Sequence, residues 1–243
     1  MSAFSSSGGA RFHEISVTTA DIRASMDFYL ALGFTALTTG DVLPHRYGVI
    51  TDGRLVLGLH EAPGLASGLT FVRPALAAWA DQLTASGMEP EVIRTHADAF
   101  NEVAFSDPEG NRLWFIEAPI HATANPGHNA SACGEFQHLG LPTRDAATLG
   151  AFWERFGFVA LGEADEPYAH HALTSDHLNL ALHSPRVLDA PALVFAAAEA
   201  DHIETLCAAT GTTPARPPRG LPHGSALFEA PEGTLLLVLA RNH

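Results

Sequence analysis

The sequence is poor in positive charge and in long apolar runs. Its 243 residues include 13 Lys+Arg against 27 Asp+Glu, which gives a formal net charge of −14 at pH 7. Such a chain repels phosphate backbones and anionic lipids, so we expect neither a nucleic-acid nor a membrane partner. The longest apolar runs, such as 190–198 and 235–240, are far shorter than the roughly 20 residues that cross a bilayer.

Cysteines and common catalytic motifs are also scarce. Cys133 and Cys207 are too few for a disulfide framework, and residues 1–10 lack the apolar core of a secretory signal. We therefore expect a cytoplasmic protein. The sequence contains no Cys-x-x-Cys, Gly-x-Gly-x-x-Gly, P-loop or Gly-x-Ser-x-Gly motif. The remaining composition, 47% hydrophobic, is typical of one or two compact globular domains.

The chain repeats itself after about half its length. Residues 21–34 align with 145–158, residues 55–60 with 178–183, and Pro-Glu-Gly at 108–110 with 231–233. Each half divides again into a strand, a helix and further strands, with Asp21 placed to cap the first helix and Gly33 to end it. We predict an α+β fold of four βαβββ modules at 12–61, 68–117, 136–184 and 192–240. The corresponding domains are 11–118 and 135–241, joined by a linker at 119–134.

Two segments give this organisation a family resemblance. One is Ile-Ser-Val at 15–17 followed by the helix from Asp21 to Gly33-Phe34, and the other is the terminal-strand segment FSDPEGNRLWFIE at 105–117. Together they resemble the vicinal oxygen chelate superfamily, which includes glyoxalase I, extradiol dioxygenases, fosfomycin-resistance enzymes and bleomycin-binding proteins. The resemblance implies a tandem member with two glyoxalase-like domains. Their mixed sheets would curl into cups, covered by helices, that hold a divalent metal or a ligand. Fold alone does not select the reaction.

The resemblance also implies metal-ligand positions on the first and last strands of each module. The first-strand positions hold Glu14 and His138, and both are chemically competent. The other positions hold residues without a suitable ligand atom, namely Gly58, Gly68, Trp114, Ala181, Ala192 and Leu237. A catalytic divalent site needs about three protein ligands, so we expect no metal cofactor.

A shifted metal site is the alternative. His60 and His183 lie two residues after Gly58 and Ala181, so strand alternation points them into the same cups. Glu14 with His60, or His138 with His183, would suit Zn, Fe, Mn or Ni. Histidines at strand ends can equally bond only to water or loop backbone.

Strand alternation also predicts which side chains line the cups. Phe12, Glu14 and Ser16 should face the first cup, while His13 and the apolar residues beside it face the helices. Glu14, buried beside Trp114, is a candidate general acid or base whose pKa would be raised by burial. Phe136 is predicted to line the second cup. The candidate ligand-binding residues are Tyr47, His60, Trp114, His138, His170 and His183.

These observations lead to three hypotheses. The first is a small-molecule-binding protein that lacks the standard metal ligands and holds an aromatic or polycyclic compound, with the acidic charge favouring a cation. The second is a metal-dependent lyase, isomerase or dioxygenase that uses shifted ligands, so whether the protein is an enzyme stays open. In the third, one half has become a scaffold for dimerisation, which makes a homodimer possible.

Overall fold

The first half of the chain forms a single mixed sheet. The computed structural model describes residues 9–40, 42–62, 64–96, 98, 100–121, 131–196 and 202–240. The elements of the first half are β1 (Arg11–Thr18), α1 (Ile22–Ala31), β2 (Thr35–Leu37), β3 (Arg46–Thr51), β4 (Val56–Glu61), β5 (Gly68–Val72), α2 (Leu76–Ala85), β6 (Val92–Arg94), β7 (Glu102–Ser106) and β8 (Arg112–Ile116).

The second half repeats this order with one strand fewer among the described residues. Its elements are β9 (Glu135–Pro142), α3 (Ala146–Glu154), β10 (Val159–Ala164), β11 (His170–Thr174), β12 (Asn179–His183), β13 (Ala192–Ala196), α4 (His202–Thr210), β14 (Ala226–Glu229) and β15 (Leu235–Leu239).

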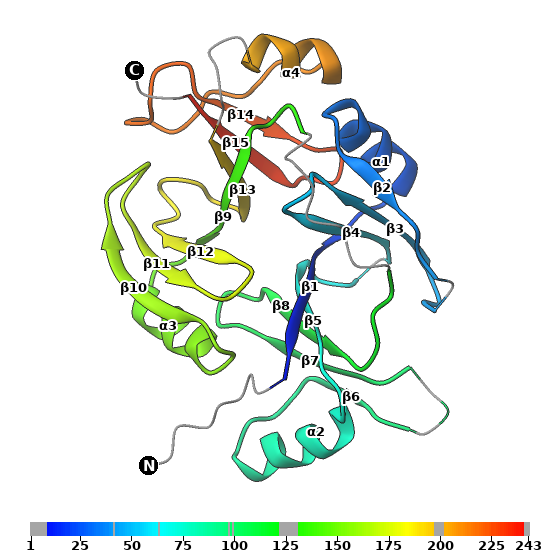
Figure 1. Ribbon diagram of the computed structural model, residues 1–243. Coiled ribbons are helices and arrows are strands. Elements are labelled where there is room, and N and C mark those ends of the chain that lie inside the picture. The colour runs from blue at the N-terminus through cyan, green and yellow to red at the C-terminus, as the bar shows by residue number, and fades with distance from the viewer. Residues whose placement is uncertain are drawn as a thin grey trace.

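Both sheets are built by joining two modules through their first strands. The strand order is β2-β3-β4-β1-β5-β8-β7-β6 in the first sheet and β10-β11-β12-β9-β13-β15-β14 in the second. Within a module the first strand runs parallel to the last, as β1 does to β4, whereas β1 and β5 pair antiparallel. In Figure 1, β1 and β9 lie near the middle of the molecule, and α1 and α4, which contact each other, lie together at the top. The predicted α+β class and its tandem organisation are confirmed.

Local sequence signals explain the first helix. The Asp21 carboxylate accepts hydrogen bonds from the backbone N–H groups of Arg23 and Ala24 at 3.0 and 3.1 Å. Gly33 follows the helix with φ of +85°, a conformation that costs glycine little, and its N–H bonds to the carbonyl of Leu30 at 3.0 Å. Both predicted helix boundaries are confirmed.

The two halves share one hydrophobic core on the helix-bearing faces of their sheets. Ile15 of β1 and Leu139 of β9 belong to the same buried cluster. Phe156, which follows α3 of the second half, packs with its ring centroid 5.3 Å from that of Phe105 and 5.7 Å from that of Phe115 of the first half. Two smaller apolar clusters lie on the opposite, concave faces, one around Trp114 and one around Leu237. The concave faces of the two halves are therefore separate sites.

The fourth module departs from the predicted βαβββ pattern, because only β14 and β15 follow α4 among the described residues. Where a further strand would run, Ala215 makes an isolated bridge to Leu227. The neighbouring residues Pro214, Pro217 and Pro218 have no backbone N–H to give a strand ladder, which accounts for the loss.

Residues 122–130, most of the predicted linker, lie outside the described residues. No helix in the described part of the chain has the length and apolar character needed to cross a membrane.

Candidate functional site

The first cup, the concave face that carries Glu14, Tyr47, His60 and Trp114, is organised around one carboxylate. Glu14 of β1 is completely buried. Its side chain accepts hydrogen bonds from Ser16 Oγ and His60 Nε2, each at 3.0 Å, and from the hydroxyl of Tyr47. His45 Nε2 lies 3.0 Å from the other ring nitrogen of His60 and extends the network outward. The carboxylate is therefore surrounded by donors and does not face an open cavity.

These contacts reverse the pKa expected for Glu14. Burial acts to raise the pKa of this carboxyl, but hydrogen bonds from His121, His60 and Tyr47 together with the charge interaction with His60 outweigh burial and hold the pKa at about 2. The expectation of a raised pKa was wrong because it counted desolvation and missed the donors. Glu14 is an ionised acceptor at neutral pH, which is a poor state for a general acid.

The segment after β8 closes the first cup. His121 Nε2 lies 3.3 Å from Glu14 Oε2, and Thr39 bridges to His121. The ring of His13 stacks on that of His121 with centroids 3.8 Å apart, and His13 Nε2 accepts the backbone N–H of Ile120 at 3.2 Å. Sequence reasoning missed His121 because it falls in the predicted linker, which shows no periodicity.

A β-bulge changes which side chains line the cups. The register of β1 against β5 shifts between Phe12 and Glu14. Phe12 accordingly packs against Phe71 in the shared core, at 5.8 Å between ring centroids, while His13 reaches His121. The predicted alternation was wrong at these two positions, because a bulge inserts an extra residue. The second half has a matching register shift, and Phe136 packs on Phe195 in the core instead of lining the second cup.

Trp114 fills the floor of the first cup. Its indole N–H donates to Glu102 at 2.6 Å, and its ring lies edge-on to His60 at 5.8 Å. Ile116 and Ile120 pack around it in the same buried cluster. Glu14, His60 and Trp114 come together as predicted, yet their packed side chains fill the interior of the first cup.

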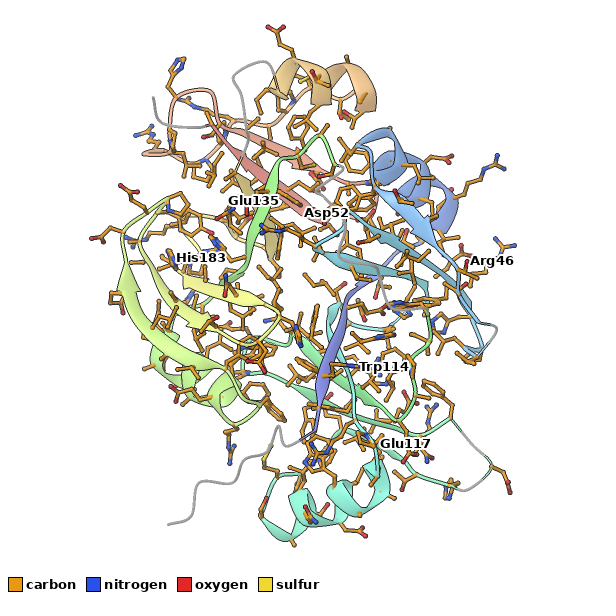
Figure 2. The ribbon with its side chains drawn as sticks, viewed as in Figure 1. Arg46, Asp52, Trp114, Glu117, Glu135 and His183 are labelled. Atoms are coloured by element: carbon orange, nitrogen blue, oxygen red, sulfur yellow. The ribbon has the colours of Figure 1, made fainter. Side chains whose placement is uncertain are left out.

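The second cup, the concave face that carries His138, Tyr168, His170 and His183, gathers three histidines around a tyrosine. Figure 2 labels His183 on β12, in a different sheet from Trp114. His138 Nε2 lies 3.0 Å from the Tyr168 hydroxyl, and the rings of His138 and His170 stack at 5.5 Å. His183 contacts Tyr168 edge-on at 5.3 Å. Tyr168 was missed from the sequence, although the 123-residue repeat relates it to His45 of the first cup.

Burial keeps the imidazoles of His138 and His183 neutral. Desolvation, followed by the proximity of His170 and His183, lowers the pKa of His138 to about 3. Desolvation also lowers the pKa of His183, which is 2% exposed. Both rings are therefore uncharged at physiological pH and each keeps one nitrogen lone pair.

An open cavity of about 520 Å³ adjoins the second cup. His138 and His170 line it from β9 and β11, Asp165 and Glu166 lie along it, and Leu239 contributes an apolar wall. Ligand pockets commonly measure roughly 300–1,000 Å³ and combine apolar surface with a few polar groups. The second cup therefore has room for a small molecule next to predicted binding residues.

The described residues do not fit the metal set that the resemblance implies. Gly58 cannot carry a ligand side chain without displacing the Glu14 carboxylate, which occupies the space where a Cβ atom would stand. Ala181 and Leu237, the corresponding positions of the second cup, are fully buried and have no ligand atom. In the alternative shifted site, Glu14 and His60 bond directly to each other.

One other group of candidate ligands occurs among the described residues. His13, Glu14 and His121 offer atoms within 4.8 Å of one another. An imidazole lone pair lies in the plane of its ring, yet the His13 and His121 rings stack with planes only 13° apart. Nearly parallel stacked rings cannot both direct a lone pair at one ion, so this group would need a ring rotation before it could bind a metal.

Comparison with known proteins agrees with this architecture. Residues 11–115 match the model of the Glyoxalase/Bleomycin resistance protein/Dioxygenase superfamily. The second half repeats the same elements in the same sheet order, with the one strand missing. The first half of the chain therefore carries the sequence signature of this superfamily. No curated protein sequence matches the chain significantly.

Solved structures resemble the chain over nearly its whole length. Homoprotocatechuate 2,3-dioxygenase from Arthrobacter globiformis is 18% identical, with 96% of this chain and 80% of that chain covered and a TM-score of 0.59. An extradiol ring-cleaving dioxygenase from B. fuscum is 16% identical, with 96% and 72% covered and a TM-score of 0.60. A catechol 2,3-dioxygenase is 14% identical, with 96% and 93% covered and a TM-score of 0.56. At these identities the likeness shows a common fold.

Proposed function

We propose that this protein binds a small aromatic or polycyclic molecule in the second cup without a metal ion. The observation that carries the proposal is the cavity of about 520 Å³ lined by His138 and His170. Apolar and aromatic surface with a few converging polar groups is the usual composition of a small-molecule pocket. The first cup, by contrast, is filled by its own buried side chains.

The residue types at the metal positions favour binding without metal. Three ligands are needed at a catalytic divalent site, and the second cup offers His138 at one family position with Ala181 and Leu237 at two others. Leu239, which lines the cavity, belongs to the apolar cluster that also includes Leu237 and Tyr168. This wall suits an apolar ring better than an ion.

The experiment is a ligand screen combined with a variant that fills the cavity. Ala196 lines the cavity, so Ala196→Trp should occupy much of it, whereas Ala147→Trp adds the same ring on the exposed face of α3. Aromatic and bicyclic compounds are screened by ligand-observed NMR, and the hits are titrated calorimetrically. We expect Ala196→Trp to weaken binding at least tenfold and Ala147→Trp to leave it unchanged. Equal binding by both variants would exclude the second cup as the site.

The second candidate function is a metal-dependent lyase, isomerase or dioxygenase, favoured by the cluster of His13, Glu14 and His121. Elemental analysis after supplying Mn, Fe, Ni and Zn in turn tests this alternative. About one retained ion per chain, lost in Glu14→Ala or His138→Ala, would support it and contradict the metal-free proposal. Retention of no ion under any supplement would exclude this alternative.

A further inference from the structure

Equivalent positions of the two cups hold different residue types. The repeat relates Glu14 to His138, His45 to Tyr168, Tyr47 to His170 and His60 to His183. Strand register agrees with this relation, because Tyr47 pairs with His60 across β3 and β4 just as His170 pairs with His183 across β11 and β12. Each cup thus has one tyrosine and two histidines around a first-strand residue.

The first-strand residue is where the cups differ in hydrogen bonding. In the first cup Glu14 is a carboxylate that accepts a hydrogen bond from His60 Nε2 at 3.0 Å. In the second cup the carboxylate is replaced by the imidazole of His138. His183 Nε2, the counterpart of His60 Nε2, is buried and has no hydrogen-bond partner among the described residues. The second cup therefore lacks a partner that the first cup supplies from its own chain.

The contacts of the histidines indicate which kind of partner is lacking. His183 Nδ1 lies 3.1 Å from the carbonyl oxygen of Ser184, and His170 Nδ1 lies 2.8 Å from that of Tyr168. A carbonyl only accepts hydrogen bonds, so Nδ1 carries a proton in both rings, and Nε2 is the nitrogen on which such a tautomer has its lone pair. The second cup consequently presents hydrogen-bond acceptors.

The charges along the cavity also favour a ligand that donates hydrogen bonds. Asp165 and Glu166 are exposed and line the cavity beside His138 and His170. Among the described residues that line it there is neither an arginine nor a lysine. Carboxylates at a cleft of a protein with net charge −14 raise the local concentration of cations.

We propose that the second cup selects an aromatic compound bearing a positively charged N–H donor, such as an amidinium or a protonated amine. The ring packs on the apolar wall that Leu239 contributes, the N–H groups donate to the Nε2 atom of His170, and the charge faces Asp165 and Glu166. The inference rests on the proposed function and adds the charge and hydrogen-bonding class of the ligand.

Three compounds of one shape test the inference. Naphthalene-2-carboxamidine, naphthalene-2-carboxamide and naphthalene-2-carboxylate differ in charge and hardly in size. Each is titrated into the full-length protein at neutral pH by ligand-observed NMR. We expect the amidinium to bind at least tenfold more tightly than the amide, its affinity to fall with added salt, and the carboxylate not to bind.

A charge-matched pair of variants separates the cavity carboxylates from net charge. Asp165→Asn combined with Glu166→Gln should lower amidinium affinity about fivefold and leave amide affinity unchanged, because exposed carboxylates each contribute modestly. Asp81→Asn combined with Glu89→Gln removes the same charge at exposed positions of the first half and should have no effect.

The possible outcomes distinguish the two proposals. Equal affinity for the three compounds, or binding of none of them, overturns the charge selectivity. The proposed function survives that result if other aromatic ligands still lose binding in Ala196→Trp. It fails if Ala196→Trp has no effect on any ligand.

Discussion

Replacing Glu14 by glutamine should show that the first cup contributes mainly to stability. Glutamine has the size of glutamate but carries no charge, and half of its terminal group donates hydrogen bonds. Glu14 accepts from Ser16, Tyr47 and His60 with no exposed surface. In Glu14→Gln, at least one of these buried donors must therefore face the N–H₂ group of the amide.

The pKa of Glu14 sets the expected magnitude. A carboxyl whose pKa falls from 4.5 to about 2 on folding adds about 3 kcal/mol to the free energy of unfolding at neutral pH. Because the folded pKa is the lower one, this contribution is complete above pH 4.5 and is lost as the pH falls toward 2. By about pH 3.5, about 1.4 kcal/mol of it should be gone.

The assay is urea unfolding of the wild type and of Glu14→Gln between pH 7 and about 3.5. We expect the variant to be less stable by about 3 kcal/mol at pH 7, with the difference shrinking as the pH falls. Glu89→Gln, at an exposed position, is the control and should differ by less than about 0.5 kcal/mol. A destabilisation below about 1 kcal/mol at pH 7, or one that does not change with pH, would refute the reasoning.

Three further predictions concern other parts of the molecule. Gly58→Ala should lower the free energy of unfolding in chemical denaturation by about 2 kcal/mol or more, because the added Cβ atom would overlap the Glu14 carboxylate. Gly40→Ala is the control and should be tolerated, because a Cβ atom there has only one distant contact. Equal effects of the two substitutions would contradict this. Glu232→Ala should cost about 2–4 kcal/mol of unfolding free energy, because the buried hydroxyl of Tyr29 donates to Glu232 across the two halves at 2.7 Å, and a loss below about 1 kcal/mol would argue against it. Burial lowers the pKa of His138 from 6.5 to about 3, so protonation favours the unfolded chain as the pH falls through this range. The free energy of unfolding of His138→Gln should therefore fall less between pH 6.5 and 4 than that of the wild type. The same pH dependence in both proteins would count against a neutral imidazole.

Much of the fold could be predicted because its signals are local. Asp21 supplies a side-chain acceptor exactly where the helix has unpaired N–H groups, and Gly33 accepts a positive φ after its last turn. The turn at Asp52-Gly53 between β3 and β4 follows from a local signal of the same kind, since Gly53 has φ of +96°. Repetition of these signals in the second half made the tandem organisation evident.

The cup linings were harder to predict because they depend on register and on distant segments. A single extra residue in β1 exchanged the environments of Phe12 and His13, and nothing in the alternation marks that insertion. The pKa of Glu14 depends on His121, which reaches the cup from a segment without periodicity. Residue types near the site were recognisable from the sequence, but the direction of their electrostatic effects required the contacts.

Duplication explains how one fold contains both a closed and an open cup. In the first cup Glu14 supplies an internal acceptor for His60, and the segment ending at His121 packs over the carboxylate. Replacing that acceptor by His138 in the second cup removes the charge that would hold such donors. The buried Nε2 atom of His183 then has no hydrogen-bond partner among the described residues. A buried polar atom without a partner costs about 1–3 kcal/mol. A ligand that donates a hydrogen bond in the cavity of the second cup meets an acceptor on His170, whereas the described side chains of the first cup already bond to one another.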